Sequence, residues 1–175
     1  MAGTNEAMNN RLKTALTFVC AEHPYLCGLA SEVEIWFTER IDTAAVTASG
    51  RILLAPDFFK ALSVPDIAII FTHELLHLFR RTHERSEGAP DPALVNIADD
   101  FIINDIISRS LDCERNGTIL KDGLIWEKFL HVFKDSIKQP VRPAHTYSLE
   151  EMVVLLQKIP GANTMRPWKR RDSAE

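Results

Sequence analysis

Residues 63–79 read SVPDIAIIFTHELLHLF, and this stretch decides how the rest of the chain is organised. Ser63 is a typical N-cap, followed by an early proline and an acidic residue, so a helix is predicted to begin at Val64. The pattern favours a helix that continues to about Arg85. Because residues 67–79 are apolar on nearly every side, we expect this helix to be buried.

Three polar side chains, His73, Glu74 and His77, interrupt this apolar helix, and burying them requires a physical reason. Residues four apart lie one above the other on a helix, so the two imidazoles can reach a single ion at about 2.1 Å, the usual Zn–N distance. Glu74 lies about 100° around the helix from His73, beside the ion, where a coordinated water would be. The HExxH pattern therefore predicts a zinc site for peptide or amide hydrolysis, with Glu74 as general base. The alternative, two core histidines and a surface glutamate without a shared ligand, is disfavoured by the apolar surroundings.

A catalytic zinc site needs a third protein ligand, and the following helix offers Asp100. Suppose that the helices on either side of the loop at residues 86–90 pack antiparallel. Two residues, one from each helix, then lie opposite each other when their numbers add up to the same constant total. His77 then faces Asp100, and His73 faces Asn104. We predict Asp100 as the third ligand, and Asn104 as the acceptor that fixes the tautomer of His73.

Two other side chains compete with Asp100 for the metal. His83 completes the histidine spacing of the metzincins, but Arg80 stands at their glycine position. A helix that continued past Arg80 would turn His83 onto another face, so His83 ranks second. Asp99 ranks third, because its neighbours one turn away are isoleucines and it is expected to face away from the polar stripe.

The remaining periodicity predicts a single α+β, zincin-like domain over residues 1–160. Apolar–polar alternation favours strands at residues 32–38 and on both sides of Gly50, arranged as a three-stranded antiparallel meander. Helical spacing and capping patterns predict further helices over residues 10–22, 91–110 and 124–133, and a last helix that begins at Ser148 and stops at Pro160. We expect a small antiparallel sheet over the buried histidine helix and a disordered basic tail over residues 161–175.

Composition narrows the class of protein further. A net charge of −4 over 175 residues argues against a chain that wraps nucleic acid over most of its surface, although the basic tail leaves a local contact open. The first residues lack the pattern of a signal peptide, and no apolar run reaches transmembrane length, so the expected address is the cytoplasm. Cys20, Cys27 and Cys113 form no C-x-x-C pair and are interpreted as reduced thiols.

The histidine helix and the helix after it together resemble a known family. HELLH at residues 73–77, followed by NIADDFIIN at residues 96–104, is similar to the metallopeptidase domain found ahead of VWA-like domains in bacteria, and to related phage-encoded proteins. The resemblance covers well over half of the chain. It implies a zinc ligand at Asp100 with Asn104 as its partner.

Two departures from that family bear on the interpretation. Val95 stands where a tryptophan is common, which affects packing. No VWA-like domain follows in these 175 residues, which favours a stand-alone, phage-encoded form that acts in the host cytoplasm.

We therefore expect a zinc-dependent metallopeptidase that cleaves a protein or peptide substrate, with no membrane partner. An exposed edge strand near the cleft, at residues 44–47 or 52–54, would hold an extended peptide. The candidates for stabilising the oxyanion are His131, His145 and Tyr147. The alternative is a non-catalytic zinc-binding phage or interaction protein on the same fold, but a structural zinc site has no use for a general base.

Overall fold

The computed structural model describes residues 2–110 and 123–165, so Cys113 and the basic residues after Met165 lie outside the described residues. The elements in chain order are α1 (Ala2–Glu22), the 3₁₀ turn η1 (Pro24–Leu26), α2 (Cys27–Glu32), β1 (Glu34–Phe37), β2 (Ala44–Val46), β3 (Arg51–Leu54), α3 (Pro56–Ala61), α4 (Val64–Phe79), α5 (Thr82–Ser86), α6 (Pro92–Ser110), α8 (Trp126–Val132), η3 (Ala144–Thr146), α9 (Leu149–Gln157) and η4 (Ala162–Thr164). The fold is α+β, mostly helical, as the periodicity predicts.

The sheet differs from the prediction in its strand order. Strands β2 and β3 form the expected antiparallel hairpin, with Gly50 at the turn in the left-handed region (φ 80°). However, β1 pairs parallel with β3 on its other edge, and the order is β1-β3-β2. The predicted antiparallel meander is therefore wrong, and the sheet of the described residues is mixed. Alternation records which side chains face the core, but not which neighbour a strand pairs with.

Helix α4 begins as predicted and ends early. At its start, Ser63 Oγ accepts a hydrogen bond from the backbone N–H of Asp66 (3.2 Å). At its end, Arg81 adopts a left-handed conformation (φ 58°, ψ 41°), and α5 starts afresh at Thr82. The prediction of one helix to Arg85 is wrong, because the glycine that usually marks such a reversal is absent and an arginine takes the left-handed conformation instead.

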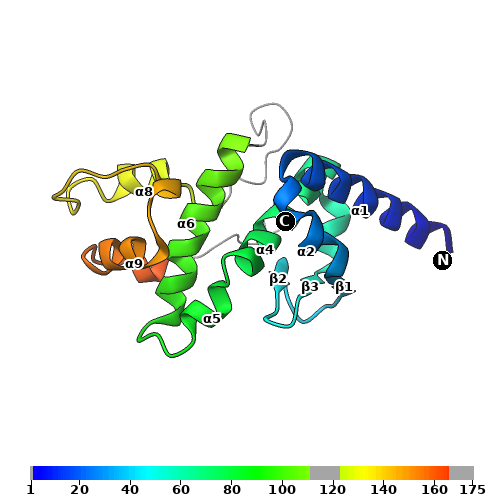
Figure 1. Ribbon diagram of the computed structural model, residues 1–175, viewed down its shortest axis with the longest axis horizontal. Helices are drawn as coiled ribbons and strands as arrows, with labels where there is room; N and C mark the ends of the chain where they lie inside the picture. The colour runs from blue at the N-terminus through cyan, green and yellow to red at the C-terminus, as the bar shows by residue number, and fades with distance from the viewer. Residues whose placement is uncertain (1, 111–122, 166–175) are drawn as a thin grey trace, which may run out of the picture.

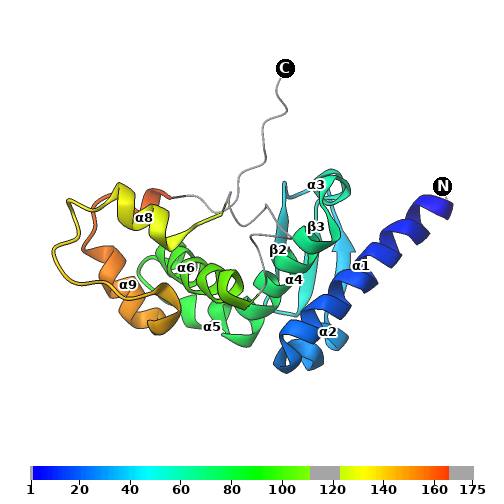
Figure 2. The same ribbon diagram turned by 90° about the horizontal axis from the view of Figure 1, so that it is seen from above.

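Buried apolar side chains of the described residues form two clusters, and α4 and α6 meet between them. The first cluster joins α1, the sheet and α4, around side chains such as Phe59 and Phe71. The second joins α6, α8 and α9, around Phe101 and Phe129. Figures 1 and 2 show the first group at the α1 side of the molecule and the second at the α8–α9 side, with α4 and α6 side by side in the middle.

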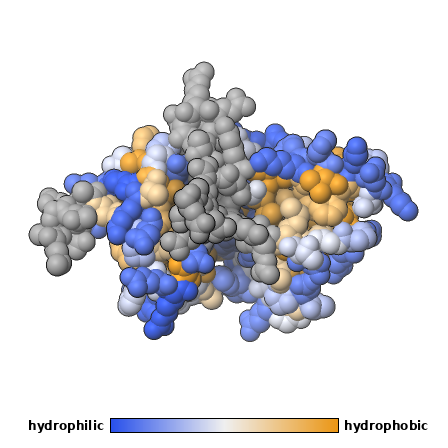
Figure 3. Space-filling view, turned by 180° about the vertical axis from the view of Figure 1, so that it is seen from behind, coloured by the Kyte–Doolittle hydropathy of each residue, from blue (hydrophilic) through white to orange (hydrophobic). Residues whose placement is uncertain are grey.

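Two further observations concern the surface and the end of the chain. On the face behind that of Figure 1, hydrophilic side chains predominate, and apolar ones gather toward the side of α8 and α9 (Figure 3). None of the described helices is long and apolar enough to cross a membrane. At the C-terminal end, η4 with its buried Ala162 follows Gly161, where the sequence predicts the start of a disordered tail.

Candidate metal centre

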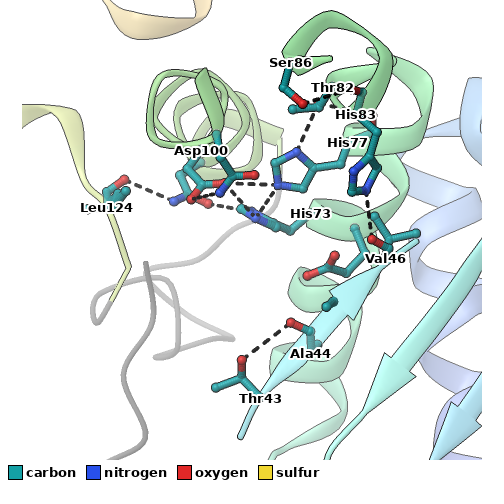
Figure 4. Close-up of a pocket in the computed structure, with 14 residues that line it drawn as sticks. Thr43, Ala44, Val46, His73, His77, Thr82, His83, Ser86, Asp100 and Leu124 are labelled. Atoms are coloured by element: carbon teal, nitrogen blue, oxygen red, sulfur yellow. Dashed lines mark hydrogen bonds and ion pairs between the residues drawn. The ribbon is translucent and has the colours of Figure 1, made fainter. Parts of the chain in front are cut away.

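The antiparallel helices α4 and α6 bring His73, His77 and Asp100 together. Asp100 Oδ1 lies 3.0 Å from His77 Nε2 and 3.4 Å from His73 Nε2. The two Nε2 atoms are 3.0 Å apart. All three side chains are buried, and their nearest nitrogen and oxygen atoms lie within 4.8 Å of one another. In Figure 4 both imidazole rings point toward Asp100 across the space between the helices.

The Nδ1 atom of His73 faces Asn104. Its distance to Asn104 Oδ1 is 2.9 Å, while Asn104 Nδ2 donates to the backbone carbonyl of Leu124 at 3.1 Å. Since the amide nitrogen is used on Leu124, the amide oxygen is left to accept from His73 Nδ1–H. This tautomer leaves the lone pair of His73 Nε2 directed toward Asp100, as a metal ligand requires.

The Nδ1 atom of His77 faces a different set of groups. It lies 3.1 Å from Thr82 Oγ1 and 3.5 Å from Asp99 Oδ2. Arg80 Nε donates to the other oxygen of Asp99 at 2.6 Å, and the Thr82 hydroxyl also donates to the Asp99 carboxylate. Both histidines therefore have an oxygen acceptor on Nδ1 and turn Nε2 toward the same point.

The electrostatics of the three residues call for a cation between them. Burial alone lowers the pKa of His77, but hydrogen bonds and charges from Asp100 and Asp99 outweigh it and raise this pKa to about 10. Burial likewise raises the pKa of Asp100, but the two imidazoles lower it to about 2. Asp100 Oδ1 nevertheless receives no well-directed hydrogen bond from any described residue. The buried Asp100 oxygen, with two imidazoles beside it, thus suits a bound cation.

The donor set fits a divalent metal. Two imidazole nitrogens and one carboxylate oxygen are a ligand combination that catalytic zinc sites use, with one position left for water or substrate. The separations within 4.8 Å are close to those required by one ion at about 2.1 Å from each atom. His73, His77 and Asp100 would hold such an ion.

A cavity of about 230 Å³ opens beside the three residues, and Glu74 lines it. The Glu74 side chain forms no hydrogen bond or ion pair to the residues that the structure describes, although its residue is only 6% exposed. The edge strand β2 forms another wall, together with His83 and Ser86 of α5. A carboxylate with unused acceptor capacity thus faces a space next to the candidate metal ligands.

The structure separates the rival ligands from the cluster. Although α4 ends before His83, the His83 ring turns toward the sheet, and its Nε2 lies 2.9 Å from the carbonyl oxygen of Val46 (Figure 4). Asp99 does not face away from the site, as the sequence suggests, but lies behind His77 on the side remote from Asp100. Because α5 folds back, groups of the next segment reach α6, which helical spacing alone could not reveal.

None of the three candidates for stabilising an oxyanion is among the described residues that line the cavity. His145 donates its backbone N–H to Asp105 Oδ2 (2.8 Å), and its Nδ1 lies 2.7 Å from the same oxygen. Tyr147 accepts a hydrogen bond from the backbone of Arg142 (2.8 Å). His131 is exposed on α8.

Sequence reasoning missed Thr82 and Arg80 as parts of the site. Both belong to the segment that was expected to continue α4, where five residues of helix would have rotated Thr82 about 140° away from His77. The one signal that could have revealed them is the metzincin spacing itself, which places a chain reversal at Arg80.

The architecture is thus an α+β domain with a buried two-histidine, one-carboxylate site on neighbouring helices. Comparison with protein families shows that residues 7–113 match the family described as "Putative metallopeptidase domain". The match covers more than half of the chain, and the protein belongs to this family. Comparison with curated proteins and with solved structures gave no match.

Proposed function

We propose that this protein is a zinc-dependent metallopeptidase of the zincin type, which hydrolyses peptide or other amide bonds. The observation that carries the proposal is the convergence of His73, His77 and Asp100 at one wall of a cavity that Glu74 also lines. Membership of the metallopeptidase family supports the same reaction class. Such an enzyme would act on protein or peptide substrates in the cytoplasm, which is the host cytoplasm if a phage encodes it.

In this mechanism, a zinc ion held by the three residues would lower the pKa of a coordinated water toward about 7 and polarise the scissile carbonyl. Glu74 would serve as the general base that takes a proton from the attacking water and as the acid that returns it to the leaving amine. Its lack of a hydrogen-bond partner among the residues that the structure describes, and its place at the cavity, suit this role. Asn104 keeps His73 in the tautomer that presents Nε2.

The edge strand β2 is the candidate substrate-binding element. The backbone groups of Thr43 and Thr47 pair with β3, since Ala55 N–H donates to Thr43 (2.8 Å) and Thr47 N–H donates to Arg51 (2.9 Å). Because strand residues alternate in direction, the N–H and C=O groups of Ala44 and the N–H of Val46 face outward, whereas the C=O of Val46 already contacts His83 Nε2. An extended peptide could pair with this edge and pass over the metal site. The other candidate, at residues 52–54, is the central strand β3 and has no open edge.

Metal content and one substitution test the proposal. Protein purified without chelator should contain about one zinc per chain and should cleave members of a diverse peptide mixture, as detected by mass spectrometry. Glu74→Gln should retain the zinc and the fold but lose all cleavage, because the amide is isosteric and cannot accept the proton. Glu127→Gln, an exposed glutamate on α8, is the matched control and should behave as the wild type.

The outcomes separate the proposal from its alternatives. A protein that neither contains nor binds zinc would disprove the proposal of a zinc-dependent metallopeptidase. Loss of zinc in Glu74→Gln would make Glu74 a ligand. If the wild type binds zinc but cleaves no more of the peptide mixture than Glu74→Gln does, the non-catalytic zinc-binding protein is favoured.

A further inference from the structure

We propose that Asp99, Thr82 and Arg80 form a positioning unit that sets the orientation and tautomer of His77, and that Asp99 is not a ligand itself. This inference rests on the metal-binding part of the proposed function and does not depend on hydrolysis. It explains how the chain reversal between α4 and α5, which was not predicted from the sequence, contributes to the metal site.

The first argument is the direction of the Asp99 side chain. Asp99 is fully buried, and its carboxylate contacts Thr82, Arg80 and the Nδ1 side of His77. Asp100, the next residue, contacts the Nε2 side of the same ring at 3.0 Å. The two neighbouring carboxylates therefore hold opposite edges of one imidazole. Asp99 is absent from the described residues that line the cavity.

The second argument concerns the single proton of the Thr82 hydroxyl. This hydroxyl donates to Asp99, because a carboxylate is a stronger acceptor than the alternative, the neutral backbone oxygen of His77 at 3.2 Å. Once that proton is used, Thr82 Oγ1 can only accept from His77 Nδ1, 3.1 Å away. The proton of His77 is thereby kept on Nδ1, and Nε2 is left to bind a metal.

The third argument is the charge of Asp99. An ionised carboxylate without exposure to water requires a partner of opposite charge, and Arg80 supplies it through a 2.6 Å hydrogen bond. Arg80 and Thr82 flank the left-handed Arg81. Arg80 reaches this carboxylate from the end of α4, and the reversal at Arg81 adds the Thr82 hydroxyl, which a continuous helix would rotate about 140° away from His77.

Substitutions at Thr82 give the sharpest test, because a matched pair exists. Thr82→Val keeps the shape and removes the hydroxyl, whereas Thr82→Ser keeps the hydroxyl. We expect Thr82→Val to weaken zinc binding by about 10- to 100-fold, the usual scale when a group that supports a metal ligand is lost. Thr82→Ser should bind with nearly the wild-type Kd. Affinity is measured by competition with a chromophoric chelator, and the d–d absorption of the Co²⁺-loaded protein should change in Thr82→Val alone.

Asp99→Asn should weaken zinc binding to a similar extent. Its control is Asp105→Asn, another buried aspartate on α6 that contacts Arg109 and His145 instead of the metal cluster, and this control should retain the wild-type zinc Kd. The thermal stability of each metal-free variant is measured alongside, so that loss of fold is not counted as loss of affinity.

The inference is overturned if Thr82→Val binds zinc and Co²⁺ as the wild type does, even where its metal-free form is less stable. Equal weakening by Thr82→Ser and Thr82→Val overturns it as well, since the hydroxyl would then not matter. A wild type that binds no zinc would remove both this inference and the proposed function. A wild type that binds zinc while Thr82→Val has no effect removes this inference alone.

Discussion

The two histidines of the candidate metal centre are held in different ways, although they occupy equivalent positions one helical turn apart. His73 is supported by a neutral amide on α6, at 2.9 Å from Asn104. His77 is supported by the hydroxyl of Thr82, which is in turn bound to a buried and charge-compensated carboxylate. Charged support makes an imidazole a more basic ligand than neutral support does. We therefore regard His77 as the stronger of the two anchors.

Substitutions of the α6 residues that face α4 should weaken zinc binding less as the residue lies farther from the proposed metal position. Asp100→Ala would remove the charged member of the proposed ligand set and should weaken zinc binding far more than Asn104→Ala does, for which about a 10- to 100-fold loss is expected. His83→Ala should change the zinc Kd little, because His83 Nε2 contacts Val46. Isothermal titration of each purified variant with zinc measures the order. If His83→Ala emptied the site and Asp100→Ala left zinc bound, the assignment of Asp100 would be wrong.

At the scale of the elements, the end of α4 is the feature that shapes the site. The helix closes with Arg80 N–H bonded to Leu76 and Arg81 N–H bonded to Leu78 (2.8 and 3.0 Å), and Arg81 then takes the left-handed conformation. A side chain other than glycine is strained in this conformation. The fold tolerates that strain at the point where the chain must reverse toward Asp99.

Arg81→Gly should therefore be more stable than Arg81→Ala, and neither substitution should disturb the site. Glycine adopts a positive φ freely, and we expect a Tm about 2–4 °C above that of Arg81→Ala. Alanine is the correct reference, because both substitutions remove the contact between Arg81 and Glu84 and only glycine relieves the backbone. Calorimetry of the two variants measures the difference. Equal Tm values would show that residue 81 is not strained.

At the scale of the whole molecule, the candidate metal centre lies where the two hydrophobic clusters meet. His73 and His77 belong to α4, which packs in the first cluster, and Asp100 belongs to α6, which packs in the second. A metal bound by all three would link the two halves directly. Metal loading should therefore stabilise the complete fold as well as the site.

Removal of the metal should lower the Tm of the protein. Free zinc at 100 times its Kd stabilises a folded chain by about 2.7 kcal/mol relative to the metal-free form, which corresponds to a Tm difference of about 5–11 °C for a domain of this size. Differential scanning calorimetry with zinc and with excess chelator measures it. His77→Ala is the control and should lose most of the shift; an undiminished shift would place the zinc elsewhere.

The contacts of Asp105 with His145 and Arg109 are expected to make the stability of the metal-free protein sensitive to acid. Burial raises the pKa of Asp105, but the backbone and side chain of His145 and the charge of Arg109 outweigh it and hold this pKa below its ordinary value. The unfolded chain therefore binds the proton more readily. The stabilisation by the ionised Asp105 carboxylate is present above a pH of about 4, the ordinary pKa of aspartate. It is lost as the pH falls through the pKa of Asp105 in the folded protein.

We expect the metal-free wild type to lose more stability between about pH 5 and pH 3 than Asp105→Asn, which has no carboxylate to protonate. Urea unfolding at several pH values measures this difference. Parallel pH profiles for the two proteins would show that Asp105 contributes nothing to the acid sensitivity.

The sequence alone determined the features that depend on local periodicity and capping. Ser63 marks the start of α4, and helical spacing puts His73 and His77 on one face. The symmetry of a helical hairpin brings Asp100 and Asn104 opposite them, and the distances between these side chains agree with that symmetry. These predictions succeed because the spacing of apolar residues within each helix indicates which face is buried.

The tertiary structure alone decided the strand order, the left-handed Arg81 and the direction of Asp99. Strand β1 could pair with either edge of the β2–β3 hairpin without changing its pattern of apolar residues, so only packing selects the parallel partner. Arg81 bears no local signal for a reversal, and the contacts that Arg80 and Thr82 make with Asp99 favour it. These contacts join residues far apart in the chain, and their energies are set by the completed fold rather than by any segment of the sequence.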